Sequence, residues 1–104
     1  MQSTPQEQRD AATSLETLGR LMSDESPHVR VAAATALGEA GDLKVLPALA
    51  RALSDTDPSV RTAAVSSLAR IGGLSARGLL RRALADPDDG VRRRANEAFF
   101  GAAR

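Results

Sequence analysis

The stretch from Asp55 to Ile71 reads DTDPSVRTAAVSSLARI, and the chain of 104 residues is built around it. The same arrangement occurs once before it, starting at Asp24, and once after it, starting at Asp86, at equal spacing. Each copy has an aspartate, then Val-Arg after four intervening residues, then an alanine, and then a leucine or a phenylalanine. The recurring sets are Asp24, Asp55 and Asp86; Val29, Val60 and Val91; Arg30, Arg61 and Arg92; Ala33, Ala64 and Ala95; and Leu37, Leu68 and Phe99. Self-similarity at a fixed period of this length is typical of stacked repeat proteins.

Each copy contains the start of a helix. Asp57 is a suitable N-cap, and Pro58 occupies the first helical position, where a missing N–H leaves no helical bond unmade. Ser26 and Pro27 have the same roles in the first copy, and Asp88 is the expected cap in the third. Apolar residues then recur at the spacing of one helical face. They are Val60, Ala64, Leu68 and Ile71 in the middle copy, and Val29, Ala33, Ala36, Leu37 and Ala40 in the first.

A second helix is expected before each copy. Its inner face is marked by Leu43, Leu46, Leu49 and Leu53 in the middle unit, by Leu15, Leu18 and Met22 in the first, and by Leu74, Leu80 and Leu84 in the third. Thr4, Pro5 and Glu7 resemble a capping box, so the first helix is expected from about Pro5 to Met22. The sequence therefore predicts one all-α domain over residues 1–104, with six helices in three units at about 5–40, 42–72 and 73–103.

These motifs resemble HEAT repeats, in particular the short 31-residue kind found in phycobilin lyases and in engineered consensus scaffolds. The likeness covers about residues 12–102 and includes Ala36-Leu37-Gly38 and Leu46-Pro47-Ala48-Leu49. It implies an α-solenoid in which the second helix of each unit, helix B, lines the concave face. The chain departs from the family pattern at Glu16 and Gly78 in place of proline, at Arg77 in place of an aliphatic residue, and at Phe99-Phe100 in place of Leu-Gly.

The resemblance also implies a non-enzymatic protein-interaction module or scaffold that binds its partner through the outward positions of helix B. Carried over position by position, the expected partner-binding residues are His28, Val31, Thr35, Glu39, Ser59, Thr62, Ser66, Arg70, Arg93, Arg94 and Glu97. These side chains are small and polar, and positive charge rises toward the third unit. We therefore expect a protein or peptide partner with acidic character.

The repeated aspartates and arginines are expected to form a structural ladder rather than a catalytic set, because a position that occurs once per repeat serves the repeat. Each carboxylate can accept N–H bonds at the start of helix B and can bind an arginine of its own unit or of the next one. The residues of this ladder are Asp24, Arg30, Asp55, Arg61, Asp86 and Arg92.

Composition limits the other function classes. The net charge of +1 argues against a bulk electrostatic footprint for nucleic acid or membrane. His28 is the only histidine and cysteine is absent, so no metal site and no cofactor are expected. No apolar run is long enough to span a bilayer, and residues 1–10 do not resemble a secretory signal. A cytoplasmic protein is the expectation.

Two alternative functions stay open. The chain could be an accessory subunit or domain of an enzyme related to the bilin lyases, although a bilin or base site would need aromatic stacking and an acid–base pair. It could also bind phosphate or nucleic acid weakly through its C-terminal arginines. Those arginines are Arg77, Arg81, Arg82, Arg92, Arg93 and Arg94.

The C-terminal end of the stack is unusual because Phe99 takes the core position and Phe100 follows it. Phe100 occupies the place of Gly38 and Ala69, which are small where helices approach closely. We expect Phe100 to fold over the end of the stack and shield Leu84 and Val91. One exposed ring is far smaller than a typical interface patch, so a monomer is expected rather than a dimer formed through this end.

Overall fold

The computed structural model describes the backbone of residues 5–101, and the side chains of Pro5 and of residues 14–101. All regular structure in that part of the chain is helical. The elements are α1 (Pro5–Leu21), α2 (Pro27–Ala40), the short 3₁₀ helix η1 (Leu43–Val45), α3 (Leu46–Ala52), α4 (Pro58–Ile71), α5 (Gly73–Ala83) and α6 (Asp89–Gly101). The expected all-α fold with six α-helices is confirmed. The expected capping box involves Thr4 and Glu7, whose side chains lie outside the described residues.

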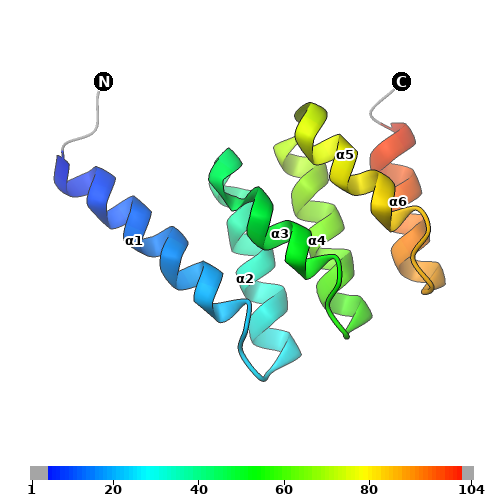
Figure 1. Cartoon of the computed structure of the whole chain (residues 1–104), viewed down its shortest axis with the longest axis horizontal. Helices are drawn as coiled ribbons and strands as arrows, with labels where there is room; N and C mark the ends of the chain where they lie inside the picture. Colours follow the sequence, from blue (N-terminus) through cyan, green and yellow to red (C-terminus); the bar gives the residue numbers. More distant parts are fainter. Residues whose placement is uncertain (1–4, 102–104) are drawn as a thin grey trace.

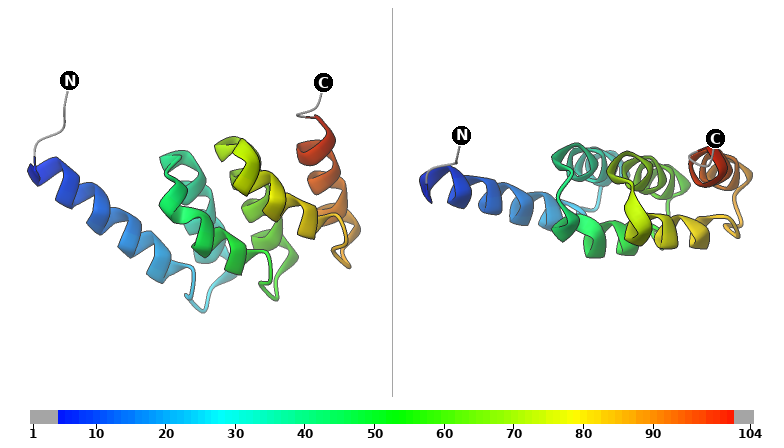
Figure 2. Two further views of the ribbon diagram at one scale, coloured as in Figure 1. Left: turned by 45° about the horizontal axis from the view of Figure 1, so that its top comes forward. Right: turned by 90° about the horizontal axis from the view of Figure 1, so that it is seen from above.

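The helices form two layers. Helices α1, α3 and α5 make one layer, here called layer A, and α2, α4 and α6 make the other, layer B (Figure 1). The Cα atoms span 43 × 36 × 15 Å, so the domain is a plate two helices thick, as the view from above shows (Figure 2). The helices of layer B pack on one another more extensively than those of layer A do.

The contact between α2 and α4 depends on small residues. A Cβ atom added to Gly38 would lie 2.3 Å from Ser67 Oγ and 2.8 Å from the Ser67 Cα. The Ser67 hydroxyl donates a hydrogen bond of 2.7 Å to the Ala34 carbonyl, so its polar group is satisfied although the residue is buried. The two helices therefore approach as closely as glycine allows.

The expected helix caps of layer B are confirmed. Ser26 Oγ accepts from the Val29 N–H, Asp57 Oδ1 accepts from the Ser59 N–H, and Asp88 Oδ1 accepts from the Val91 N–H. In α2 and α4 the next residue is proline, whose fixed φ suits the first helical position.

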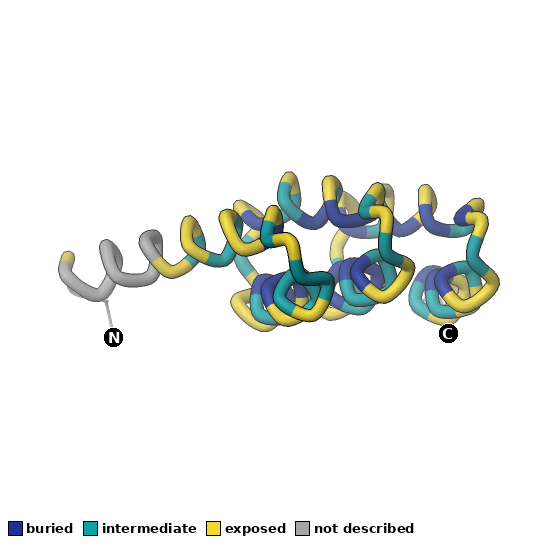
Figure 3. The backbone as a smooth tube through the Cα atoms, turned by 90° about the horizontal axis from the view of Figure 1, so that it is seen from below, coloured by how far each residue is buried: buried dark blue, intermediate teal, exposed yellow. Residues whose placement is uncertain are grey.

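The core lies where the two layers face each other (Figure 3). Two leucines expected there are in fact exposed: Leu43 at 65% and Leu74 at 89%. Val45 and Ala76 are buried in their place. The buried residues Val45, Leu49, Ala52 and Leu53 lie at offsets of 0, 4, 7 and 8, which is one face of a helix. Leu43, two residues before Val45 in the same 3₁₀ turn, lies off that face.

The first unit is less buried than the sequence pattern predicts. Val29 is half-buried, while its equivalents Val60 and Val91 are fully buried. Ala40, expected inside, is exposed. It is the last residue of α2, next to Gly41, whose φ of 67° ends the helix in the left-handed conformation that glycine tolerates.

The C-terminal end of the stack is closed by Phe99 and Arg77 rather than by Phe100. Phe99 is buried, the Arg77 guanidinium carbon lies 4.1 Å from the centre of its ring, and Arg77 Nη1 donates to the Phe99 carbonyl at 2.9 Å. Phe100 remains 55% exposed and stands edge-on to Phe99, with ring centres 5.0 Å apart. The expected shielding by Phe100 is therefore incorrect: the arginine at the aliphatic position of the repeat supplies the cover instead.

Candidate interaction surface

The ladder residues join one unit to the next at the turn before helix B. Arg30 donates two hydrogen bonds to the Asp55 carboxylate, from Nε to Oδ2 at 2.9 Å and from Nη2 to Oδ1 at 3.1 Å. Its third nitrogen, Nη1, donates to the Asp24 carbonyl of its own unit at 2.7 Å. Arg30 thus binds the backbone of its own turn and the carboxylate of the following turn. The sequence led us to expect that each aspartate would bind the arginine of its own or of the next unit. This expectation is wrong: Asp55 binds the arginine of the preceding unit, because the Arg30 side chain reaches forward across the contact between the units.

The second rung repeats the first. Arg61 Nε donates to Asp86 Oδ2 at 2.8 Å, Nη2 donates to Oδ1 at 3.1 Å, and Nη1 donates to the Asp55 carbonyl at 2.8 Å. The two side chains are only 12% and 7% exposed. Each ladder aspartate also accepts the N–H two residues further along the chain, which fixes the turn itself. A largely buried bidentate pair with this many bonds holds the units in register.

The electrostatics of Asp86 reflect this environment. Burial alone would raise the pKa of its carboxyl. The hydrogen bonds from Arg61 and from the Asp88 N–H, together with the charges of Arg61 and Arg92, outweigh burial and hold the pKa below its ordinary value. In the third unit, Arg92 binds the Asp86 carbonyl and the Asp89 carboxylate. These contacts support a structural role for the ladder.

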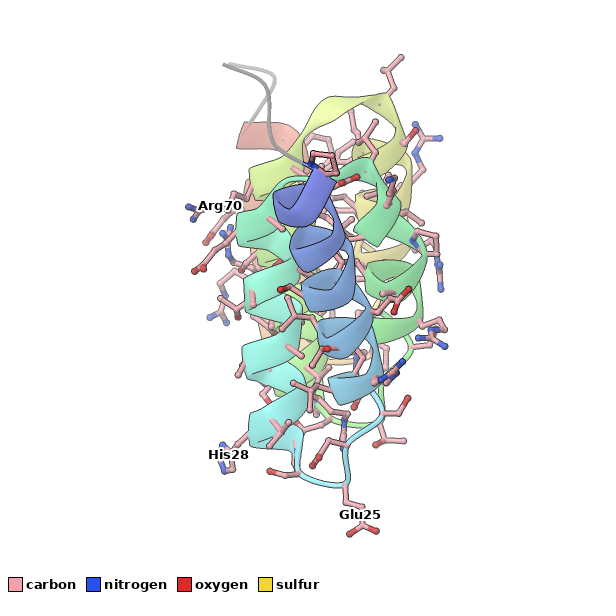
Figure 4. The ribbon with its side chains drawn as sticks, turned by 90° about the vertical axis from the view of Figure 1, so that its left-hand side faces the viewer. Glu25, His28 and Arg70 are labelled. Atoms are coloured by element: carbon pink, nitrogen blue, oxygen red, sulfur yellow. The ribbon has the colours of Figure 1, made fainter. Side chains whose placement is uncertain are left out.

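The predicted partner-binding residues lie on the outward face of layer B. His28 and Arg70 project from the same side of the molecule, near opposite ends of the layer-B helices (Figure 4). Most of these side chains are exposed or half-exposed, and Val31 packs partly against the core. The Thr35 hydroxyl is turned back to the Val31 carbonyl at 2.9 Å. The face is therefore accessible, but not all of it is free.

Part of this face lines a depression of about 400 Å³. We call it the layer-B depression. Its lining includes five predicted residues, Thr35, Glu39, Ser66, Arg70 and Arg94, together with Ser67 and Ala69. The remaining predicted residues, namely His28, Val31, Ser59, Thr62, Arg93 and Glu97, lie outside it. The structure therefore brings together residues of α2, α4 and α6 from all three units.

Ser67 was not predicted, although it lines the depression and connects α4 to α2. A signal for it exists in the sequence: its equivalents in the other two units are Ala36 and Ala98, so Ser67 breaks the repeat at that position. The outward helical pattern pointed to the neighbouring Ser66 instead.

Of the three charged side chains that line the depression, only Arg94 has bonding partners among the described side chains. Arg94 Nε donates to Ser66 Oγ at 3.1 Å, and Arg94 Nη1 lies 3.7 Å from Glu97 Oε2. Within the described side chains, Arg70 and Glu39 take part in no hydrogen bond or ion pair. Two arginines and one glutamate thus border the same hollow, and donors and acceptors remain available for a ligand.

The C-terminal arginines do not form one patch. Arg77 covers Phe99, Arg82 donates to Ser54 Oγ at 3.2 Å, and Arg92 belongs to the ladder. Arg81 lies on α5 in layer A, whereas Arg93 and Arg94 lie on α6 in layer B. The cluster seen along the sequence is thus divided between two faces.

A larger cavity of about 610 Å³ lies between α1 and α3 in layer A. It is lined largely by apolar residues, including Leu15, Leu37 and Val45. Leu15 has its equivalent in Leu46, and Leu37 has its equivalent in Leu68, so the lining follows the repeat pattern. We therefore interpret this cavity as a gap between two helices that exposes repeated core positions, and not as a site built from residues that occur in one unit only.

No group of side chains suited to a metal ion is assembled in the described part of the chain. No three residues among the histidines, aspartates and glutamates described come together as a possible metal site. His28 is exposed. None of the helices within residues 5–101 is both long and apolar enough to cross a membrane.

Two layers of paired helices, a fixed sequence period and a bonded ladder between units define an α-solenoid. The chain matches the family model for HEAT repeats over residues 14–99, and it belongs to that family. No curated protein matches the chain. HEAT-repeat proteins generally mediate protein–protein interactions or act as scaffolds, and they are typically not enzymes. The narrower likeness to the phycobilin lyases stays a prediction.

Proposed function

We propose that this chain is a non-enzymatic interaction module that binds a protein or peptide with acidic residues through the outward face of layer B. The observation that carries the proposal is the layer-B depression, which combines residues from three units and holds arginines that do not recur along the repeat. A position repeated in every unit serves the stack, whereas a side chain present once is available for recognition.

Charge favours an acidic partner. Arg70, Arg93 and Arg94 face outward from α4 and α6, against Glu39 on α2 and Glu97 on α6. The net charge of these outward side chains is therefore negative on α2 and positive on both α4 and α6. The face has no Trp or Tyr anchor of the kind that dominates tight interfaces, so we expect modest affinity, with dissociation constants around the micromolar range.

The two alternatives have less support. An enzyme-associated role would need a pocket with an acid–base pair, and the layer-B depression contains only Glu39 as a carboxylate and no histidine. Phosphate or nucleic-acid binding through the C-terminal arginines would need these residues on one surface, and they are divided between the layers. The proposal includes that the chain is a monomer. The outward face of layer B belongs to a single chain, so binding a partner there does not require a second copy.

A random peptide library displayed on phage tests the proposal. Peptides selected on the wild-type chain are measured by fluorescence polarisation against R70E/R94E and against the matched layer-A variant K44E/R81E. Both variants change the net charge by the same amount, and none of the four residues recurs along the repeat. We expect R70E/R94E to lose binding and K44E/R81E to keep it, with both melting near the wild-type temperature. Equal losses in the two variants would reject the proposed face.

A further inference from the structure

The residues that line the layer-B depression include some that depart from the repeat. Arg94 stands where the other units have Ala32 and Ala63, and Arg70 stands where the first unit has Glu39. By contrast, Arg30, Arg61 and Arg92 recur in register and serve the ladder. The depression thus combines an arginine from the third unit, an arginine from the second and a glutamate from the first.

The two arginines converge on one turn of α4. Arg94 Nε is hydrogen-bonded to Ser66 Oγ, and Ser66 and Arg70 are four residues apart on α4, so they share one face of that helix. Arg94 uses Nε for this bond, and its only ion pair in the described region is the long one to Glu97. Guanidinium groups with unused N–H donors bind a carboxylate best when two donors reach it together.

Glu39 provides a second point of opposite sign. It occupies on α2 the place that Arg70 occupies on α4, and adjacent packed helices lie about 8–10 Å apart. In an extended chain, side chains two residues apart point the same way about 7 Å apart. In a polyproline II segment, side chains three residues apart do so at about 9 Å. A short segment can therefore reach both points.

We propose that the layer-B depression recognises a pair of opposite charges on an extended partner segment. An acidic side chain lies between Arg70 and Arg94, and a basic side chain two or three residues away lies at Glu39. This inference rests on the proposed function and makes it more specific: the preferred ligand carries mixed charge, whereas a uniformly acidic tract would place negative charge against Glu39.

The first experiment sequences the peptides that the display library yields on the wild-type chain and on the charge-reversed variant E39K. On the wild-type chain we expect enrichment of an acidic residue with a basic residue two or three positions away, in one order along the peptide. On E39K we expect the basic residue to be replaced by a neutral or acidic one. Enriched peptides that need layer B but show no basic residue would overturn the charge-pair inference and leave the proposed function intact.

The second experiment measures coupling with one enriched synthetic peptide, its Lys→Gln form and its Glu→Gln form. R70Q is expected to weaken binding of the parent peptide about 10-fold, since hydrogen bonds to charged groups are worth more than neutral ones. E39Q is expected to weaken it about 2–5-fold, as for an exposed ion pair. E39Q must have no further effect on the Lys→Gln peptide, and R70Q none on the Glu→Gln peptide. Additive losses would refute direct pairing, and K44E/R81E serves as the charge control.

Discussion

The turns between the units and the outward face of layer B use the same residue types in opposite ways. In the turns, Arg30 and Arg61 are largely buried, each binds a carboxylate with two bonds, and the two occupy equivalent positions of the repeat. On the face, Arg70 has no partner within the described side chains, and neither it nor Arg94 recurs. The comparison indicates that repetition marks residues that hold the stack together, and departure from repetition marks residues available to a partner.

The largest expected loss of stability is in the repeated core of the middle unit. Leu68 is completely buried and has a unit on either side. Leu68→Ala should lower the free energy of unfolding by about 2–5 kcal/mol, because burial is lost and a cavity remains. Leu37→Ala should cost a similar or smaller amount. Urea denaturation measures both, and near-wild-type values for the two variants would contradict the proposed repeat register.

The ladder should matter more than the neighbouring cap, although both are aspartates. Asp55→Ala leaves Arg30 largely buried without its carboxylate and should cost about 2–3 kcal/mol. Asp57→Ala removes only the bonds from the Ser59 N–H and hydroxyl at an exposed helix start, and should cost less. Thermal melting of the two variants gives the order. If Asp57→Ala melted lower, the ladder would not be the main connection between the units.

Even one added methyl group should weaken the close contact between α2 and α4. Gly38→Ala places a Cβ within 2.8 Å of the Ser67 backbone, so the helices must separate, at a cost of about 1–3 kcal/mol. Gly19→Ala is the control, because nothing lies within 4 Å of its Cβ. Alanine favours helix there and should stabilise by up to about 1 kcal/mol. Equal effects in urea denaturation would show that the contact is looser than described.

The ladder should also make stability depend on pH in the acid range. The pKa of Asp86 is depressed in the folded chain, so its contribution is fully present above the ordinary value of 3.8 and is lost as pH falls through the lower folded value. The difference in unfolding free energy between wild type and D86N should thus be constant from pH 5 to 7 and narrow below about pH 4. A difference that stayed the same at pH 3 would mean that the Asp86 carboxylate is not stabilised by Arg61.

The smallest expected effect is at Phe100, which neither recurs nor closes the stack. Phe100→Ser removes an edge contact with Phe99 and should cost about 0.5–1 kcal/mol. Light scattering over a wide concentration range should show a monomer both before and after the substitution. A wild-type dimer that this change converts to a monomer would place an interface at this end and contradict the proposed monomeric state.

Several sequence expectations failed for reasons that only packing supplies. Leu43 and Leu74 occupy equivalent positions of two units, yet both side chains are exposed. Leu43 lies in the 3₁₀ turn before α3, and Leu74 lies in the first turn of α5. Phe100 looked like the end cap, but Arg77 reaches the Phe99 ring from α5. A one-dimensional pattern indicates which positions are equivalent; it does not indicate where a 3₁₀ turn changes the face or which long side chain covers an exposed ring.

The sequence by itself determined the class of fold, the number of units, the caps of layer B and the positions of the Asp–Arg ladder, because each of these depends on local chemistry repeated at a fixed period. Only the tertiary structure decided that Arg30 and Arg61 each bind the aspartate of the following unit, and that Arg94 reaches Ser66 to form one depression with Arg70 and Glu39. These contacts join residues far apart in the sequence, and the spacing and angle of the packed helices determine which side chains meet.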